Sequence, residues 1–196
     1  MTQAPSARRF DAVTITLHWA TVILIVGMFA SVWALSFATG GDQATGLLTL
    51  HRSLGLTVWA VVCCRLVWRV RFAILPPFPS AMSKLQQRAA RLSEYALYAL
   101  LLLQPLTGLA QSLTRGRPFH LFVFEAPKLM AKDKPLTALL NQIHGLTAWV
   151  LLGLIGLHVT AALFHRFVLH DEVLPSMLPW RPKRSGVAQE IAPPRE

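Results

Sequence analysis

A long stretch without charge is the feature that most limits how this chain can fold. Between Asp11 and Asp42 the sequence has no Asp, Glu, Lys or Arg and is rich in Val, Ile, Leu and Ala. A helix that crosses the hydrocarbon core of a bilayer needs about 20 predominantly apolar residues. The stretch is long enough for one crossing and too long for the apolar region of a signal peptide. We therefore expect a transmembrane helix here.

Three further apolar stretches predict three further crossings. The second extends from about Thr49 to Val70, and its arginines lie near its ends, where long side chains can extend to the interface. The third lies between Glu94 and Arg115 and contains Pro105, which predicts a kink. The fourth lies between Lys134 and Arg166. Together the four stretches predict an all-α fold, an integral membrane four-helix bundle.

The composition agrees with a membrane protein. Apolar residues make up 54% of the chain and charged residues only 14%, whereas about a quarter of the residues in a soluble domain are charged. The net charge of +10 could indicate a nucleic-acid partner. However, the basic residues cluster between the apolar stretches, as expected next to anionic lipid. We therefore expect membrane lipid, and no nucleic acid, around this chain.

The distribution of Lys and Arg predicts the orientation. Thirteen of the 19 lie on the side that holds both termini and six on the other. Because cytoplasmic loops are enriched in Lys and Arg, both termini should be cytoplasmic. We expect residues 1–11 to form a cytoplasmic N-terminus and residues 12–171 to form the four-helix transmembrane domain. Residues 172–196, rich in Pro and charge, should be a disordered cytoplasmic tail.

Five of the seven histidines lie in or at the edge of the predicted helices, where ionisable groups are costly and need a reason. At about 1.5 Å per residue, His18 and His158 lie at one depth, on the cytoplasmic side. His51 and His144 lie at another depth, near the outer surface. A lone histidine would more often be a neutral imidazole bonded to a carbonyl. Histidines matched in depth instead predict two imidazole pairs, one toward each surface.

The ligand types indicate the metal. A zinc site needs three or four N, S or O ligands together, but each depth offers only two histidines. Two axial imidazoles are what a haem iron takes, because the porphyrin fills the other four positions. There is no C-x-x-C-H motif, so the haem would be non-covalent haem b, two per chain. Small residues could let the helices separate around the macrocycle: Gly55, Gly145, Gly153 and Gly156.

These residues resemble the bacterial cytochrome b561 family of small four-helix di-haem membrane cytochromes. The shared motifs are Leu17-His18-Trp19, His51-x-x-x-Gly55 with the arginine-rich end of that helix, His144, Gly-Leu-His ending at His158, then His165, and a Leu-Pro-Trp-Arg motif around Pro179. The likeness covers residues 10–182. It implies a bacterial inner-membrane protein with quinone as redox partner, and some members oxidise superoxide and reduce ubiquinone. The family's axial haem ligands correspond to His18, His51, His144 and His158.

Three other histidines lie outside the two depth-matched pairs. His165 lies seven residues beyond His158, at the level of the cytoplasmic headgroups. It is either an ordinary interfacial histidine or a hydrogen-bond and proton partner for a quinone carbonyl. His120 and His170 lie in a connector and just beyond the last helix, and we expect both to be solvated.

The outer connector, from about Thr114 to Leu140, has five Lys or Arg and two acidic residues. A positively charged outer loop is unusual, because Lys and Arg are normally enriched in cytoplasmic loops. One explanation is that longer loops cross the membrane despite their charge. Alternatively, a positive field formed by Arg115, Arg117 and Lys132 could steer superoxide to the outer haem.

Two functions follow from these alternatives. The first is a superoxide:ubiquinone oxidoreductase (a superoxide oxidase), with ubiquinone as the electron acceptor. The second is a cytochrome b membrane anchor that passes electrons from a hydrogenase or dehydrogenase partner to quinone. A structural or transport protein with chance histidines would instead be colourless.

Overall fold

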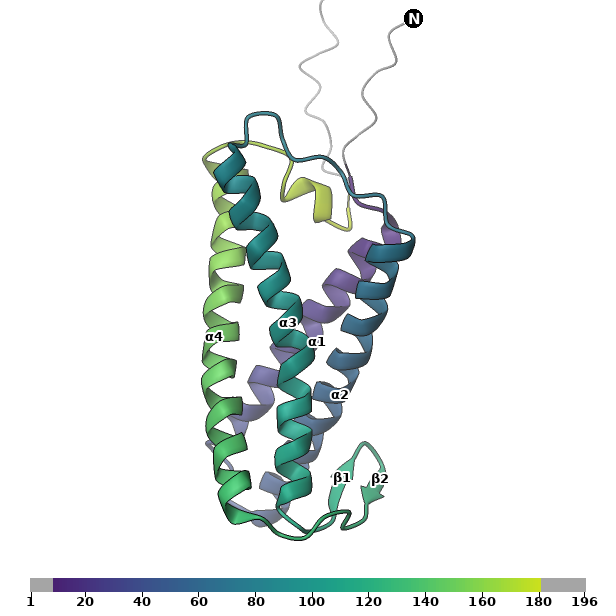
Figure 1. The fold of residues 1–196 in the computed structure, drawn as a ribbon, viewed down its shortest axis with the longest axis vertical. Coiled ribbons are helices and arrows are strands. Elements are labelled where there is room, and N and C mark those ends of the chain that lie inside the picture. Colours follow the sequence, from purple (N-terminus) through teal and green to yellow (C-terminus); the bar gives the residue numbers. More distant parts are fainter. Residues whose placement is uncertain (1–8, 181–196) are drawn as a thin grey trace, which may run out of the picture.

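The computed structural model describes residues 9–180, and this part of the chain forms four long helices and one short hairpin (Figure 1). Each long helix is long and apolar enough to cross a membrane, so the predicted all-α membrane fold is confirmed. The elements are α1 (Ala12–Leu35), α2 (Gly41–Arg71), α3 (Lys84–Thr114), β1 (Phe119–Leu121), β2 (Phe124–Ala126), α4 (Lys134–Phe167) and the 3-10 helix η1 (Pro175–Met177).

Two of the helices begin earlier than the apolar stretches predict. α2 begins at Gly41 and α3 at Lys84, so both extend beyond the hydrocarbon region. The start of α3 is fixed by a capping box, in which Ser83 and Gln86 bond each other's backbone amides. α3 also continues through Pro105 without interruption. Hydropathy marks only the part of a helix that lies in lipid, which is why these polar ends were missed.

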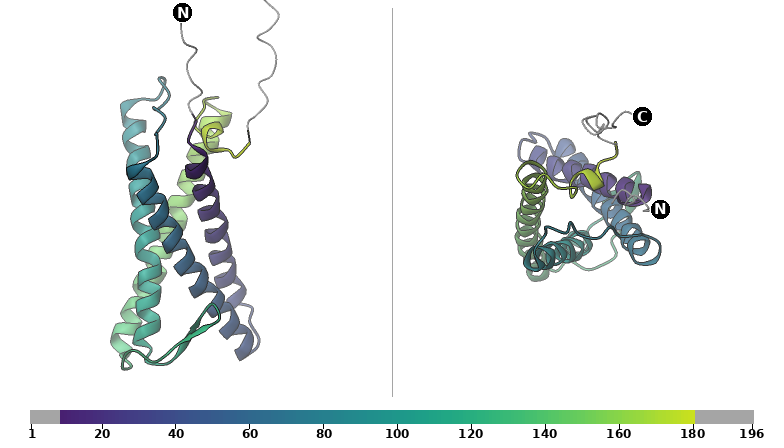
Figure 2. Two further views of the ribbon diagram at one scale, coloured as in Figure 1. Left: turned by 90° about the vertical axis from the view of Figure 1, so that its right-hand side faces the viewer. Right: turned by 90° about the horizontal axis from the view of Figure 1, so that it is seen from above.

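The helices pack in sequence order around the bundle, α1 on α2, α2 on α3 and α3 on α4 (Figure 2). α4 is the least covered of them. Only 6% of its most apolar window is buried, against 22–28% in the other three. The other helices therefore bury few of its side chains.

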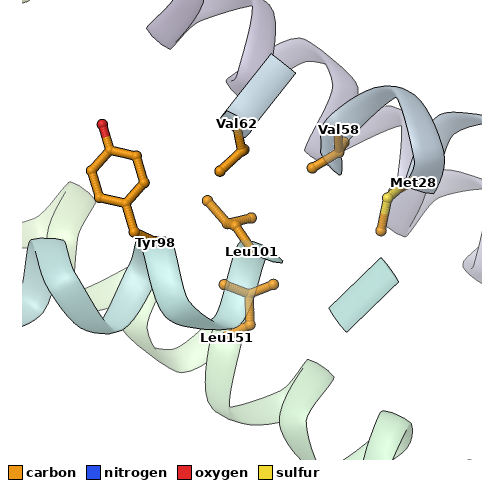
Figure 3. Packing of buried hydrophobic residues seen from close by; sticks show 6 residues of the cluster. All are labelled: Met28, Val58, Val62, Tyr98, Leu101 and Leu151. Atoms are coloured by element: carbon orange, nitrogen blue, oxygen red, sulfur yellow. The ribbon is translucent and has the colours of Figure 1, made fainter. Parts of the chain in front are cut away.

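A small apolar cluster joins all four helices (Figure 3). Val58 and Val62, at its centre, are 1% and 0% exposed. Lipid is as apolar as these side chains, so close packing rather than the hydrophobic effect holds the helices together here. The cluster consists of Met28, Val58, Val62, Tyr98, Leu101 and Leu151.

At the end of the bundle where α1 begins and α4 ends, here called the terminal end, α1 and α2 are tied together by Asp11. Its carboxylate accepts hydrogen bonds from the Thr14 amide at 2.9 Å and from Trp68 Nε1 at 3.0 Å. Burial acts to raise the pKa of Asp11, but these hydrogen bonds outweigh it and hold the pKa below its ordinary value. The carboxylate therefore remains charged at neutral pH and fixes the level of α1 against α2.

Residues 171–178, here called the strap, fold back across the terminal end. Trp19 Nε1 donates to the Met177 carbonyl at 2.8 Å, and the Phe10 amide donates to the Ser176 carbonyl at 3.3 Å. The prediction of disorder from residue 172 is therefore wrong for residues 172–180, because donors at the start of α1 satisfy the strap's carbonyls. Residues 181–196 lie outside the described residues.

At the opposite end, here called the hairpin end, β1 and β2 pair antiparallel, and β1 lies against α2. The Phe122 amide donates to Ser53 Oγ at 2.6 Å, and the Asp133 amide donates to the Thr114 carbonyl at 3.0 Å. Gly116 has φ +62°, and a Cβ there would lie 2.5 Å from the Lys132 amide nitrogen. These contacts hold the connector close to the bundle. The hairpin itself was not predicted, because three-residue strands give no usable alternation in sequence.

Candidate metal centres

Two pairs of imidazole rings meet inside the bundle. The ring centres of His18 on α1 and His158 on α4 are 6.4 Å apart, with the ring planes at 60°. Those of His51 on α2 and His144 on α4 are 6.3 Å apart, at 85°. The first pair lies toward the terminal end and the second toward the hairpin end. The structure thus brings together the histidines that the depth argument paired.

The spacing of both pairs fits one metal ion between two rings. An imidazole nitrogen lies about 2.0 Å from a first-row metal and about 1.1 Å from its own ring centre, so two rings on one ion have centres about 6.2 Å apart. Within residues 9–180 no group of three or more His, Cys, Asp or Glu side chains could hold a metal ion. Two imidazoles therefore suit an ion whose remaining ligands come from a macrocycle.

Hydroxyl groups determine which nitrogen is free in the pair at the hairpin end. Thr107 Oγ1 donates its hydrogen to the Gln104 carbonyl at 2.8 Å. The same oxygen lies 3.0 Å from Nδ1 of His144. Because its one hydrogen is already donated to the carbonyl, it accepts the hydrogen of Nδ1. The unprotonated nitrogen of this ring is then Nε2, which is available to a metal.

His51 has the same arrangement on the other side of the pair. Ser31 Oγ donates to the Met28 carbonyl at 2.7 Å and lies 3.2 Å from Nδ1 of His51. The same carbonyl is 3.4 Å from that nitrogen. Both rings thus direct Nδ1–H to protein oxygens and leave Nε2 free. The sequence did not indicate Ser31 and Thr107, because nothing in a sequence distinguishes such hydroxyls from other helix serines and threonines.

Gly108 leaves room for the ring of His144, although the sequence did not single out this glycine. A Cβ on Gly108 of α3 would lie only 3.0 Å from Cε1 of His144, so glycine lets this imidazole lie against α3. Of the glycines predicted to let the helices separate, three leave open space beside them. A Cβ added at Gly145, Gly153 or Gly156 would have no neighbouring atom within 4 Å in the described chain. Gly55 would contact only the sulfur of Met28, at 3.9 Å.

Basic side chains gather near the hairpin end. A surface cavity of about 430 Å³ is lined by Arg115, Arg117, Lys132 and Lys134, together with Gln111 and Asn141. We call this the basic pocket. Arg117 and Lys132 are exposed, whereas Nε of Arg115 is buried without a hydrogen-bond partner in the described chain. The three cations predicted to steer an anion therefore line one concave surface.

Arg52, next to His51, packs beside the same connector. Its Nε donates to Ser112 Oγ at 3.1 Å, and its guanidinium lies over the ring of Phe119, 5.4 Å from the centre. Phe119 is itself buried in the hairpin. This arginine, next to His51, thus ties α2 to both α3 and the hairpin.

His165 is buried, with 8% of its surface exposed. Its Nδ1 lies 2.5 Å from a carboxylate oxygen of Asp171, at the start of the strap. The other Asp171 oxygen accepts from the Val173 amide at 3.0 Å. His120 and His170 are exposed, as predicted.

Comparison with known sequences identifies the family. Residues 9–180 match the sequence model of prokaryotic cytochrome b561. The chain belongs to this family. The resemblance noted from the histidine motifs is therefore confirmed.

Individual relatives align with this cytochrome b561 over most of their length. Cytochrome b561 homolog 1 of Escherichia coli (strain K12) is 30% identical over 179 residues, covering 88% of this chain and 98% of the relative. Cytochrome b561 homolog 2 of the same strain is 29% identical over 172 residues, covering 87% and 91%. Probable superoxide oxidase CybB of Yersinia pestis is 26% identical over 172 residues, covering 88% and 97%.

Family membership makes this cytochrome b561 a multi-pass bacterial membrane protein of electron transfer, and it implies b-type haem. The side chains fit that cofactor. The two ring spacings suit axial ligation, the hydroxyl bonds leave Nε2 of His51 and His144 free, and Nδ1 of His18 is buried without a hydrogen-bond partner in residues 9–180.

Proposed function

We propose that this cytochrome b561 is a di-haem b-type superoxide:ubiquinone oxidoreductase. The main support is that two imidazole pairs, each spaced for one iron, lie toward opposite ends of the bundle. Such an arrangement suits the passage of electrons from one membrane surface toward the other. His18 with His158 would hold one haem iron, and His51 with His144 would hold the other.

The reaction has a simple electron and proton balance. Two superoxide anions each give up one electron and become O₂, and one ubiquinone takes both electrons and two protons to become ubiquinol. When bound, haem supplies the one-electron relay. The chain's own part is to fix the imidazoles, to exclude water between the pairs with the apolar cluster of Figure 3, and to provide a proton near the quinone.

The donor side is proposed at the hairpin end. The basic pocket lies in the connector that follows α3, and both Thr107 and Gly108 of α3 contact His144. A positive concave surface attracts a small anion, and one relative is named a probable superoxide oxidase. The Lys and Arg distribution supports placing this end outside and both termini in the cytoplasm of a bacterial inner membrane.

The proton side is proposed at His165, paired with Asp171. We expect His165→Ala to keep both haems and to slow quinone reduction on the order of 10²-fold, the usual effect of losing a general acid. Haem content and stopped-flow quinone reduction measure the two effects. His170→Ala, which removes an exposed histidine five residues away, is the control and should change neither. Loss of haem from His165→Ala would mean that this residue is a ligand.

The experiment that tests the proposed function uses the protein purified alone. Its reduced-minus-oxidised spectrum should show b-type haem with about two haems per chain, a stoichiometry that follows from two bis-imidazole sites. In proteoliposomes, a superoxide source should reduce ubiquinone without any added protein. A haem protein that is inactive alone and copurifies with a soluble hydrogenase or dehydrogenase would instead support the anchor-subunit function.

A further inference from the structure

Arg65 of α2 lies in an unusual position for a charged side chain. It follows Val58 and Val62 at helical spacing, on the side of α2 that faces the bundle interior. Its guanidinium lies over the ring of Tyr98 on α3, 5.3 Å from the centre. Its Nε is buried and has no hydrogen-bond partner in residues 9–180. The sequence suggested that this arginine extends to the interface, but the structure shows that it packs inward.

The nearby carboxylate does not serve Arg65. Glu94 is bound by Arg69, with Nη1–Oε1 at 2.7 Å and Nη2–Oε2 at 2.8 Å. This two-bond geometry uses both carboxylate oxygens. Within residues 9–180, Arg65 therefore has an aromatic face but no carboxylate bonded to it. Because a charge in the membrane interior is costly unless it is paired, an anion should complete this site.

The site adjoins the His18–His158 pair. The hydrogen bond from Trp68 to Asp11 sets α1 and α2 level. Counted from that bond at about 1.5 Å per residue, Arg65 lies about 5 Å and His18 about 10 Å into the bundle. An anion bound to Arg65 would therefore lie beside the proposed haem site at the terminal end.

We propose that Arg65 binds a propionate carboxylate of the haem that His18 and His158 hold. Haem b has two such carboxylates, and the planar fork of a guanidinium can donate to one. The proposal rests on the proposed function, because it requires haem at this pair. A lipid phosphate has similar chemistry, so the test must separate the two anions.

The first measurement is the release of haem from the purified holoprotein to excess apomyoglobin. Losing one charge-assisted hydrogen bond should speed release of the haem at the terminal end about 10- to 100-fold in Arg65→Gln. The haem at the hairpin end should be unaffected. Arg65→Lys, which keeps the charge without the planar fork, should give a smaller effect and guards against a variant that does not fold. The control is Arg71→Gln, at the exposed end of α2, which should match the unmodified protein.

The second measurement distinguishes propionate from lipid. Haem dimethyl ester, exchanged into the holoprotein, lacks the carboxylate charge. It should be released faster than haem from the unmodified protein, but Arg65→Gln should add little to that effect. If the effects of the ester and of Arg65→Gln are independent, Arg65 does not bind propionate and the proposal is wrong. Equal release from Arg65→Gln and Arg71→Gln would also overturn it.

The two hypotheses fail in different ways. If His18→Ala keeps both haems, the proposed haem site itself is wrong. If His18→Ala loses one haem while Arg65→Gln releases haem at the control rate, only the role of Arg65 is wrong.

Discussion

His18→Ala and His158→Ala are each expected to lose the same haem and to keep the other. His51→Ala and His144→Ala should lose the second haem and keep the first. The reason is geometric, because each pair of rings is spaced for one iron and the two pairs share no ligand. Each variant should thus fall from about two haems per chain to about one. Haem content per chain and a redox titration measure the number and the identity of the haem that remains.

His120→Ala is the matched control, because it removes an exposed histidine from β1 and should keep both haems. The informative comparison is between His18→Ala and His144→Ala, which alter different helices and different pairs. If these two variants lost the same haem and kept the other, the pairing would be wrong. If every variant kept both haems, other residues would have to be the ligands.

The sequence was enough to predict which histidines meet. Helix rise is nearly constant, so distance along the chain from a charged boundary measures depth in a membrane helix. His18 and His158 lie seven and eight residues from such boundaries, and their ring centres are 6.4 Å apart in the structure. Depth therefore remained a good guide even though α2 and α3 begin earlier than hydropathy indicated.

The sequence could not show what surrounds the rings. The hydrogen bond between Thr107 and His144, the room left by Gly108 and the pairing of His165 with Asp171 depend on how segments turn toward each other. Arg65 illustrates the same limit. Its place near a helix end predicts an interfacial side chain, and only the packing of α2 on α3 brings it over Tyr98. Hydropathy reports depth but not the direction in which a side chain points.

The rate at which superoxide reduces the protein should depend strongly on salt. The basic pocket places several positive charges on one concave surface that extends to Asn141, one helical turn before His144 on α4. Such a field raises the rate of association with an anion by about 10- to 10³-fold at low ionic strength. The Debye length shrinks to about 10 Å at 0.1 M salt, which removes much of this gain. Pulse radiolysis that follows haem reduction at several salt concentrations measures the effect.

Charge reversal separates this pocket from the overall charge of the protein. Arg117→Glu and Lys132→Glu change exposed side chains that line the pocket, so each should slow reduction and flatten the salt dependence. Arg88→Glu makes the same change in net charge on an exposed residue near the start of α3, at the opposite end, and should have little effect. Arg115 is less suitable, because its Nε is buried and reversal would disturb the connector.

A slow rate that neither salt nor these substitutions change would exclude superoxide steering. The positive connector would then serve another electron donor, as an anchor subunit requires.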